Sequence, residues 1–373
     1  MKIGYDAKRA YHNPTGLGNY SRTLIGGMLK QHPENEYLLM DTGNPMDLPY
    51  FNRQLNDSGA NWKYESGGMF GKHSRSYGWG SKARSLKLDV YHGLSNEIPL
   101  DWKPGATKSV VTIHDVIFKR YPEAYKALDR FFYNRKTQFA CKKADIILAT
   151  SLQTKSDLEE YYPDSRGRIQ VVYQDTDPAF HYRKRTEAVA KILYKFDIVE
   201  RPYILCVSKL EKRKNHKVLL EAFRSVMSQI PEDLVLVGGR GDTGDEILEH
   251  LGDYDGRLRW LGNVETDDLV NLYDGASYTA YPSVFEGFGI PLLESMRRGK
   301  AIVSSTGSCF QEIAGQAALY ADPTRSEEMA QQLLRLSTDA ELKRLLETAG
   351  QTESKRFDLK VLVETIHGVY RDL

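Results

Sequence analysis

Short apolar runs alternate with helix-like stretches along the whole chain, and this alternation limits the fold more than any other feature. Leu17, Tyr20 and Leu24 recur at helical spacing, for example, and predict one face of a helix. Strands separated by helices indicate parallel α/β layers. The expected strands are Lys2–Asp6, Glu36–Asp41, Lys87–Gly93, Ser109–Asp115, Asp145–Thr150, Pro202–Ser208, Leu234–Gly238, Leu258–Leu261, Tyr278–Tyr281, Ala301–Ser304 and Ala318–Tyr320.

The strand–helix series begins a second time at Arg201, which predicts two domains. A chain of 373 residues is also too long for one typical hydrophobic core. The segment Asp175–Arg201 contains a basic cluster and a proline, and it is the best candidate for the linker. We therefore expect an N-terminal domain over residues 1–180, a C-terminal domain over 200–357 and a final helical segment over 358–373.

Composition and charge narrow the function classes. A formal net charge of +1 argues against a protein held to nucleic acid by its overall charge, so no nucleic-acid partner is expected. No apolar run is long enough to span a membrane, and the first residues enter a strand without the apolar segment of a signal peptide. The three cysteines and nine histidines are scattered. We expect reduced thiols, no metal site and a cytoplasmic protein.

The stretch Ser283–Ser305 carries the most chemistry. Glu286 and Glu294 stand eight residues apart, with Gly287-Phe288-Gly289 after the first of them. The glycines predict a tight turn, and the residues after it predict a short helix and then a strand. A helix N-terminus offers free backbone N–H groups to an anion. The two carboxylates can contact different ends of one polar ligand, or they can be a capped turn and a solvated helix residue.

Two loops in the first half lie where parallel sheets bind ligands, beyond the carboxyl ends of strands. Gly16 and Gly18 follow the first strand, and their missing side chains would let the backbone approach a phosphate. His114 and Asp115 end another apolar strand. The alternatives are an ordinary connecting loop and an aspartate that caps a helix beside a space-filling histidine.

A cationic loop joins the first strand of the second half to the next helix. It contains Lys209, Lys212, Arg213 and Lys214. Cations at such a junction can stabilise the negative charge of a leaving diphosphate without a metal. The alternative is a solvated loop. Further along, the segment Gly262–Val264 is another glycine-containing loop after a strand.

Together, these motifs resemble the retaining family 4 glycosyltransferases, which carry a Glu-x7-Glu signature. The match is close over EGFG, the following P and LES, and GKAIV. The resemblance covers nearly the whole chain, most clearly Ser208–Asp322, and the nearest subgroup is the bacterial mannosyltransferase-B-like enzymes. It implies the GT-B fold, in which two Rossmann-like α/β domains face a central cleft and the last helix crosses back to the N-terminal domain.

The resemblance also implies roles for the motif residues. Glu286 would lie beside the donor sugar, Glu294 would hold the ribose, and His114 would donate a hydrogen bond to the sugar or phosphate. Lys209 stands where the family often has Arg, which keeps the charge but loses the bidentate fork. The expected catalytic residues are Glu286, His114 and Lys214. The expected donor-binding residues are Gly16, Gly18, Lys209, Lys214, Gly262, Asn263, Val264, Gly287, Phe288, Gly289 and Glu294.

The implied activity is a retaining, metal-independent hexosyl transfer from a nucleotide diphosphate sugar, with no additional cofactor. GDP-mannose is the favoured donor and UDP-hexoses are the alternative. The acceptor would be a hydroxyl of a glycan or lipid-linked saccharide in bacterial surface polysaccharide synthesis. Competing functions are a GT-B sugar-nucleotide epimerase, a phosphorylase, which would need a pyridoxal phosphate lysine, and a non-catalytic nucleotide-sugar-binding protein.

The region Asn61–Lys143 is locally basic, with 16 Lys and Arg against 7 Asp and Glu, and aromatic residues are interleaved. Such a surface suits anionic lipid headgroups, and it also suits single-stranded nucleic acid or a simple solvated face. With a lipid-linked acceptor, the first use places the protein at the inner face of the cell membrane. The sequence-based hypothesis assigns this contact to Lys72–Arg84.

Overall fold

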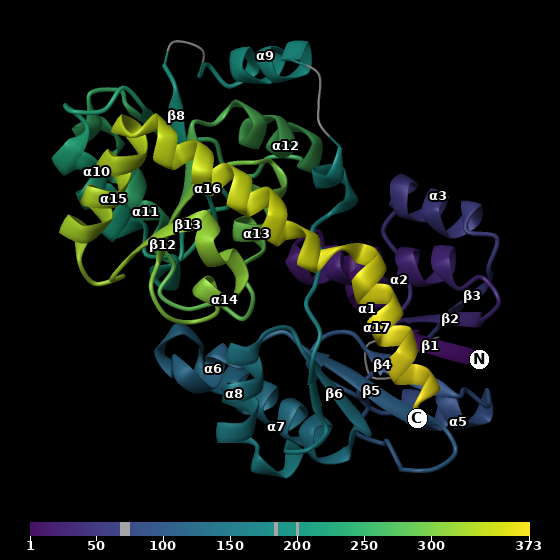
Figure 1. Cartoon of the computed structure of the whole chain (residues 1–373). Helices are drawn as coiled ribbons and strands as arrows, with labels where there is room; N and C mark the ends of the chain where they lie inside the picture. The colour runs from purple at the N-terminus through teal and green to yellow at the C-terminus, as the bar shows by residue number, and fades with distance from the viewer. Residues whose placement is uncertain (68–74, 183–185, 199–200) are drawn as a thin grey trace. The chain divides into compact units, whose positions relative to one another are not determined.

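The computed structural model describes residues 1–67, 75–182, 186–198 and 201–373, and the chain forms two compact units (Figure 1). Unit 1 consists of Met1–Asp177 and Phe357–Leu373, and unit 2 consists of Pro178–Arg356. The segment expected to be a linker is therefore mostly part of unit 2. It contains the helix α9 (Thr186–Lys195), which packs against α12 (Thr266–Gly275).

Unit 1 contains a parallel sheet with the strand order β3-β2-β1-β4-β5-β6-β7. Its strands are β1 (Lys2–Asp6), β2 (Glu36–Asp41), β3 (Asn61–Ser66), β4 (Val90–Gly93), β5 (Lys108–Ile113), β6 (Ile146–Ala149) and β7 (Ile169–Val171). Every neighbouring pair is parallel. The two edge strands, β3 and β7, were not expected from the sequence, because neither contains an uninterrupted apolar run.

The helices of unit 1 cover this sheet and include the last helix of the chain. They are α1 (Lys8–His12), α2 (Gly16–Gln31), α3 (Pro49–Asp57), α5 (Trp79–Ser85), α6 (Ile117–Arg120), α7 (Ala127–Lys143), α8 (Leu152–Tyr161) and α17 (Leu359–Arg371). Helix α17 packs on α2, and its Val363 and Ile366 are fully buried in the same core as Leu24 and Met28. The hydroxyl of Tyr370 also lies 2.6 Å from Nδ1 of His92, a residue of β4. The C-terminal helix is thus an integral part of the core of unit 1.

Unit 2 repeats the architecture with a parallel sheet in the order β10-β9-β8-β11-β12-β13. Its strands are β8 (Tyr203–Val207), β9 (Asp233–Val237), β10 (Leu258–Trp260), β11 (Tyr278–Tyr281), β12 (Ile302–Ser305) and β13 (Ala318–Ala321). Its other helices are α10 (His216–Val226), α11 (Gly244–Glu249), α13 (Ile290–Arg297), α14 (Phe310–Ala314), α15 (Ser326–Thr338) and α16 (Ala340–Glu353). All six strands lie within two residues of the expected ones.

Both units are α/β layers around a parallel sheet, as the alternation of strands and helices predicts. Consequently, the loops that follow the strands gather at the carboxyl edge of each sheet, where ligands bind in such folds. In unit 1 this edge carries the connections after β1 and β5. In unit 2 it carries the β8–α10 and β11–α13 connections.

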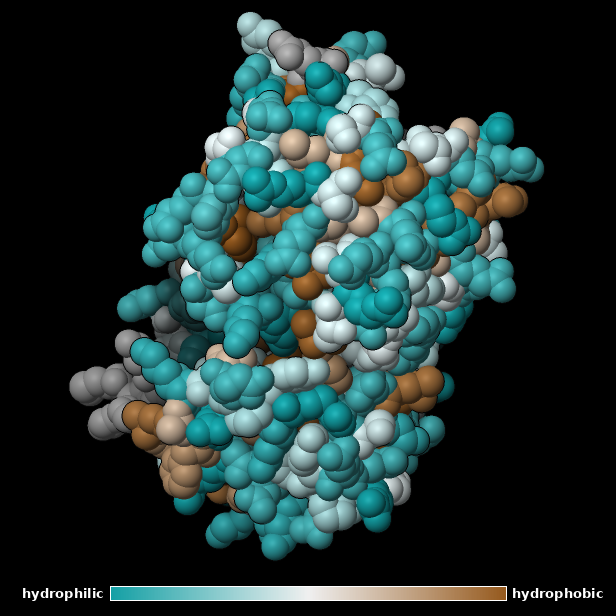
Figure 2. Space-filling model, turned by 90° about the vertical axis from the view of Figure 1, so that its left-hand side faces the viewer, coloured by the Kyte–Doolittle hydropathy of each residue, from teal (hydrophilic) through white to brown (hydrophobic). Residues whose placement is uncertain are grey.

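The surface in view in Figure 2 is mainly hydrophilic, with separate apolar areas. Among the described residues of unit 1, large exposed apolar side chains cluster on α7, namely Leu128, Phe131 and Phe132. Among the described residues, no helix has the length and apolar character that a membrane span requires.

Candidate active site

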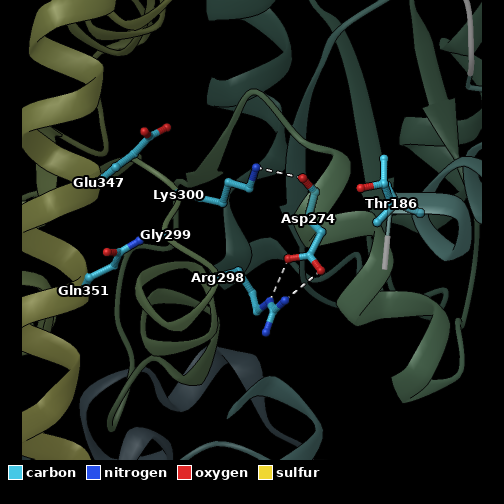
Figure 3. A pocket seen from close by; sticks show the side chains of 8 residues that line it. Thr186, Asp274, Arg298, Gly299, Lys300, Glu347 and Gln351 are labelled. Carbon is cyan, nitrogen blue, oxygen red and sulfur yellow. Dashed lines mark hydrogen bonds and ion pairs between the residues drawn. The ribbon is translucent and has the colours of Figure 1, made fainter. Parts of the chain in front are cut away.

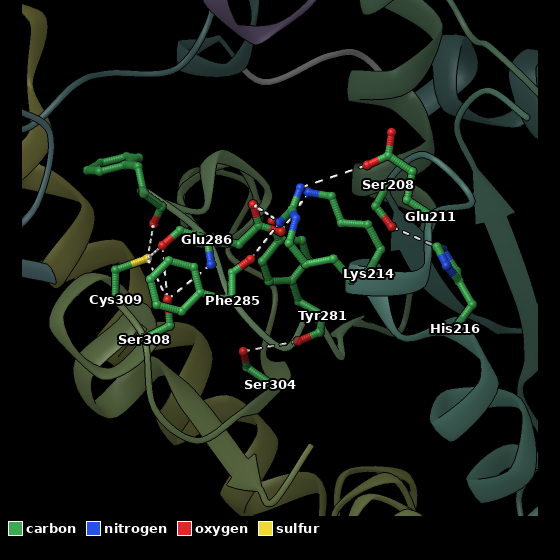
Figure 4. A network of polar contacts seen from close by, with 12 residues as sticks. Ser208, Glu211, Lys214, His216, Tyr281, Phe285, Glu286, Ser304, Ser308 and Cys309 are labelled. Atoms are coloured by element: carbon green, nitrogen blue, oxygen red, sulfur yellow. Dashed lines mark hydrogen bonds and ion pairs between the residues drawn. The ribbon is translucent and has the colours of Figure 1, made fainter. Parts of the chain in front are cut away.

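Two loops at the carboxyl edge of the unit 2 sheet are tied together by hydrogen bonds. The N–H of Val284, in the β11–α13 connection, donates to the carbonyl of Arg213, in the β8–α10 connection, at 2.9 Å. Asn215 adopts a left-handed conformation with φ of 59°, and its amide donates to the carbonyls of Pro282 and Pro323. The cationic loop and the Glu286 turn therefore form one rigid site (Figure 4).

Glu286 is the centre of this site. Its Oε1 accepts a hydrogen bond from Lys214 Nζ at 2.6 Å, and its Oε2 pairs with the Arg213 guanidinium at 2.8 Å. Glu286 as a whole is only 7% exposed. Burial alone would raise the pKa of Glu286, but the charges of Lys214 and Arg213 outweigh this effect and lower it to about 2. Glu286 is thus ionised at neutral pH and holds two cations beside it.

The backbone around Glu286 is also held by hydrogen bonds from Ser308 and Cys309. Its N–H donates to Ser308 Oγ at 3.0 Å, and the same hydroxyl donates to the Glu286 carbonyl at 2.9 Å. Cys309 Sγ donates to the Phe288 carbonyl. Gly289, with φ of +90°, makes the left-handed step into α13, which a side chain would strain. The left-handed φ explains why the turn needs Gly289. The hydrogen bonds hold the backbone that carries the Glu286 carboxylate.

Glu294 lies on α13 and is buried, with 8% of its surface exposed. Its Oε2 accepts a hydrogen bond from the hydroxyl of Tyr273, a residue of α12, at 2.7 Å. The alternative interpretation of Glu294 as a solvated helix residue is therefore wrong. A buried carboxylate with a fixed partner is suited to bind hydroxyl groups, as the expected ribose role requires.

The four cations of the loop differ in their surroundings. Arg213 contacts both Glu286 and the Phe285 carbonyl, and its side chain is 14% exposed. Lys209 instead pairs with Glu211 at 2.9 Å and is 55% exposed, so it is linked to Glu286 only indirectly, through Glu211 and its 3.8 Å ion pair with Arg213. Arg213 is not among the site residues expected from the sequence, because four neighbouring cations look alike in a sequence and only burial separates them.

The expected base-binding segment follows β10. The carbonyl of Gly262 accepts from the N–H of Gly238 at 2.8 Å, and Trp260 Nε1 donates to the carbonyl of Gly238. Asn263 lies next to Gly239, where an added Cβ would come within 2.9 Å of its side chain. Gly262, Asn263 and Val264 are therefore packed beside the end of β9, at the same edge of the sheet as Lys214.

In unit 1, the expected phosphate loop opens α2. A Cβ on Gly18 would lie 1.7 Å from the carbonyl oxygen of Asn13, so this glycine is required by its own loop. By contrast, no described heavy atom lies within 4 Å of a Cβ on Gly16. Only Gly16 therefore leaves room beside the start of the helix for a ligand.

His114, at the end of β5, is 7% exposed and stands edge-on to Tyr20. Its Nε2 is 2.9 Å from the carbonyl of Leu94, which can only accept, so Nε2 carries the proton. Burial and the Arg9 charge lower the pKa of His114 to about 4. The neutral ring thus has a lone pair on Nδ1 and can accept a hydrogen bond there. This geometry does not fit the expected role of His114 as a donor to sugar or phosphate.

Asp115, the neighbour of His114, accepts the N–H of Ile117 at 3.1 Å. This contact lies at the entry into α6, but the N-cap of that helix is Val116, without a side-chain cap, so Asp115 is not the capping residue of the alternative interpretation. His114 is therefore the residue of this pair that the geometry leaves open for a ligand, through Nδ1.

A separate polar pocket of about 430 Å³ lies within unit 2 (Figure 3). It is bordered by the residues that precede β11 and β12, and thus by the amino ends of these strands. Arg298 forms a bidentate ion pair with Asp274, and Lys300 donates to the carbonyls of Asp274 and Ala276. Because these groups satisfy one another, and because Glu286 follows the opposite ends of the strands, we assign the pocket a structural rather than a catalytic role.

Comparison with known proteins identifies the class. Residues 192–353 match the family model of the glycosyl transferases group 1, and residues 69–180 match that of glycosyltransferase family 4. The chain belongs to these glycosyltransferases and has their GT-B fold. Sucrose-phosphate synthase from Thermosynechococcus elongatus superposes with a TM-score of 0.76 at 15% identity, over 100% of this chain and 98% of that one.

A second solved structure, Anabaena Alr3699/HepE in complex with UDP and glucose, has a TM-score of 0.72 at 17% identity and covers 100% of both chains. Among curated proteins, this chain is similar to O-antigen chain mannosyltransferase B of Escherichia coli. The two are 29% identical over 375 residues, which is 96% of each. The chain is also 31% identical to the phosphatidyl-myo-inositol mannosyltransferase of Mycolicibacterium smegmatis, over 43% of this chain and 42% of that protein. These relatives favour a glycosyltransferase over an epimerase or a binding protein.

Proposed function

We propose that this glycosyltransferase moves a hexose, with mannose favoured, from a nucleotide diphosphate sugar to a hydroxyl of a bacterial surface glycan. The Glu286–Lys214–Arg213 network carries the proposal. Two cations held beside a buried carboxylate form a preorganised electrostatic site for a group that gains negative charge. The similarity to O-antigen mannosyltransferase B supports mannose and a surface glycan.

In the proposed mechanism, Lys214 and Arg213 stabilise the leaving diphosphate. Glu286 accepts hydrogen bonds from hydroxyls of the donor sugar, and Glu294 does so from the ribose. Because the two cations supply positive charge, the reaction needs no metal ion. Retention follows if the acceptor attacks from the face that the diphosphate leaves, with the leaving phosphate oxygen taking the proton of the acceptor hydroxyl. His114 Nδ1 is free to accept a hydrogen bond from a sugar hydroxyl.

The donor can be tested by thermal unfolding with a panel of nucleotides and nucleotide sugars. GDP and GDP-mannose are expected to raise the melting temperature, and EDTA is expected to leave that rise unchanged. A ligand at 100 times its Kd stabilises the folded state by about 2.7 kcal/mol, which corresponds to several degrees. If only UDP compounds raise the melting temperature, a UDP-hexose becomes the favoured donor in place of GDP-mannose. No response to any nucleotide would contradict the proposed function.

We also propose that unit 1 contacts an anionic membrane that carries a lipid-linked acceptor. The hypothesis based on Lys72–Arg84 changes in detail, because Lys72 lies outside the described residues and Lys82 pairs with Glu65 at 2.8 Å. Helix α7 is the better candidate, since its exposed Phe131 and Phe132 stand among basic residues. Apolar side chains flanked by cations suit the interface of an anionic bilayer.

Sedimentation with phosphatidylglycerol-containing vesicles tests the membrane contact. The double variant Phe131→Ser/Phe132→Ser is expected to lose most of the bound fraction at low salt. Leu345→Ser is a matched control, because Leu345 is an equally exposed apolar residue of α16 in unit 2. Equal binding by the wild-type protein and the double variant would rule out α7 as the contact.

A further inference from the structure

A group of charged side chains at the carboxyl edge of the unit 1 sheet has no assigned role. Asp6 ends β1, Lys8 and Arg9 begin α1, and Arg75 and Glu97 come from later loops. Asp6, Arg75 and Glu97 are each less than 10% exposed. Charged groups that are removed from water need opposite charges, either from one another or from a ligand.

The two carboxylates of this group are already paired. Arg75 Nε contacts Asp6 Oδ2 at 2.7 Å, and a second nitrogen of Arg75 pairs with Glu97. The remaining Glu97 oxygen accepts from Lys136 Nζ at 2.7 Å. Ser95 accepts a hydrogen bond from Arg75 as well. Arg75 and Lys136 therefore pair with the two carboxylates that could otherwise have neutralised Lys8 and Arg9.

Lys8 and Arg9 are left without a direct partner. Within the described ranges, neither side chain makes a hydrogen bond or ion pair, and Arg9 Nε is a buried donor with no acceptor. Burial and the positive charge of Arg75 lower the pKa of both Lys8 and Arg9. The missing partners and the repulsion by Arg75 both indicate that positive charge exceeds negative charge at this half-buried place.

The charge of Arg9 connects this excess charge with His114, a site residue of the same unit. Its charge acts on His114, the histidine at the end of β5, and on Tyr133 of α7. Arg9 follows β1 and His114 follows β5, so both lie at the edge of the unit 1 sheet where parallel α/β folds bind ligands. An anion that approached His114 would therefore also be attracted by the charge of Arg9.

We propose that Lys8 and Arg9 form a binding site for a phosphate group of a substrate. The inference rests on the proposed function, which supplies two sources of such a group, namely the diphosphate of the donor and a phosphate of a lipid-linked acceptor. A phosphate has the charge that this place lacks and accepts the bidentate hydrogen bonds of a guanidinium. The unpaired Arg9 Nε is one of the donors that it would satisfy.

Isothermal titration of the full chain tests the site with two probes, inorganic pyrophosphate and GDP, or UDP if the nucleotide panel selects it. The variants are Lys8→Ala and Arg9→Ala. Arg53→Ala is the matched control, because Arg53 is an exposed cation of α3 in the same unit. Thermal unfolding verifies that each variant retains its fold, and Arg9→Lys is expected to recover part of any lost binding through its charge.

The outcomes separate the two sources. If the phosphate belongs to the acceptor, pyrophosphate binds to the nucleotide-saturated protein, and Arg9→Ala weakens this binding at least tenfold while nucleotide affinity is unchanged. If it belongs to the donor, Arg9→Ala weakens nucleotide binding at least tenfold and pyrophosphate competes with the nucleotide. Variants of both residues that bind both probes as Arg53→Ala does would overturn the inference. Failure of the wild-type protein to bind any nucleotide would instead contradict the proposed function.

Discussion

The variant Lys214→Ala is expected to transfer sugar about 10²–10³-fold more slowly than the wild-type protein while remaining folded, since this is the usual effect of removing one preorganised charge-stabilising group. Lys214 is one of two cations on Glu286, and its ammonium lies 2.6 Å from the carboxylate. Its removal takes away charge stabilisation of the leaving diphosphate. The measurement is kcat/KM for transfer from the donor, together with the circular dichroism spectrum and melting temperature.

The same substitution has a second expected effect, on pH dependence. Lys214 is the main cation that counteracts the burial of Glu286 and keeps the pKa of this carboxyl near 2. In Lys214→Ala the pKa of Glu286 should rise. When the pH is lowered, the variant should therefore lose its remaining activity at a higher pH than the wild-type protein does.

Lys212→Ala is the matched control for Lys214, because Lys212 belongs to the same cationic run but is exposed. It should retain nearly full activity. If Lys214→Ala is instead as active as Lys212→Ala, the leaving-group role is wrong. If Lys214→Ala does not accumulate as folded protein, the contact with Glu286 is structural.

Acidification from pH 7.5 to 5 is expected to destabilise the protein strongly, and unit 1 more than unit 2. Three buried histidines are responsible. Burial is the main cause that lowers the pKa of His92 to about 3 and those of His114 and His216 to about 4. His92 and His114 lie in unit 1, and His216 lies in unit 2.

The sign follows from proton linkage. Each histidine is neutral when folded and takes up a proton on unfolding below its ordinary pKa of 6.5. The contribution of each neutral histidine to stability is thus fully present above pH 6.5. It is lost as the pH falls toward the pKa of the folded state, and the loss at pH 5 is about 2 kcal/mol per histidine. Glu286, with its pKa of about 2, adds to the loss only below its ordinary value of 4.5.

Urea unfolding at pH 7.5, 6.5, 5.5 and 5.0, with hydrogen exchange to separate the units, measures this effect. The variant His92→Gln should be less stable at pH 7.5, because His92 contacts Tyr370 and Thr112, but its stability should vary less with pH. A free energy of unfolding that is constant from pH 7.5 to 5 in both units would contradict the prediction.

Part of the fold was accessible from local patterns. β1, β2 and β11 have the expected boundaries, because each is an apolar run between polar residues that buries nearly every side chain. The edge strand β3 was missed, since its alternation of aromatic and charged residues becomes a strand only through pairing with β2. The sequence predicts a linker where helix α9 forms, because the contacts with α12 that stabilise this helix are distant in sequence.

The same division holds for the site. The spacing of Glu286, Gly289 and Glu294 identified the turn and both carboxylates, because a glycine turn before a helix is a local property. The pairing of Glu286 with Lys214 and Arg213 joins residues 72 and 73 positions apart, and only the packing of neighbouring strands brings them together.

The sequence alone determined the parallel α/β class, the two units and the positions of the chemical motifs, because periodicity and turn residues act over a few neighbours. The tertiary structure decided which two of four similar cations contact Glu286, and which nitrogen of His114 holds a proton. It also decided that Lys8 and Arg9 are left unpaired while Arg75 takes both carboxylates. These outcomes depend on burial and on distances between remote residues, which no local pattern contains.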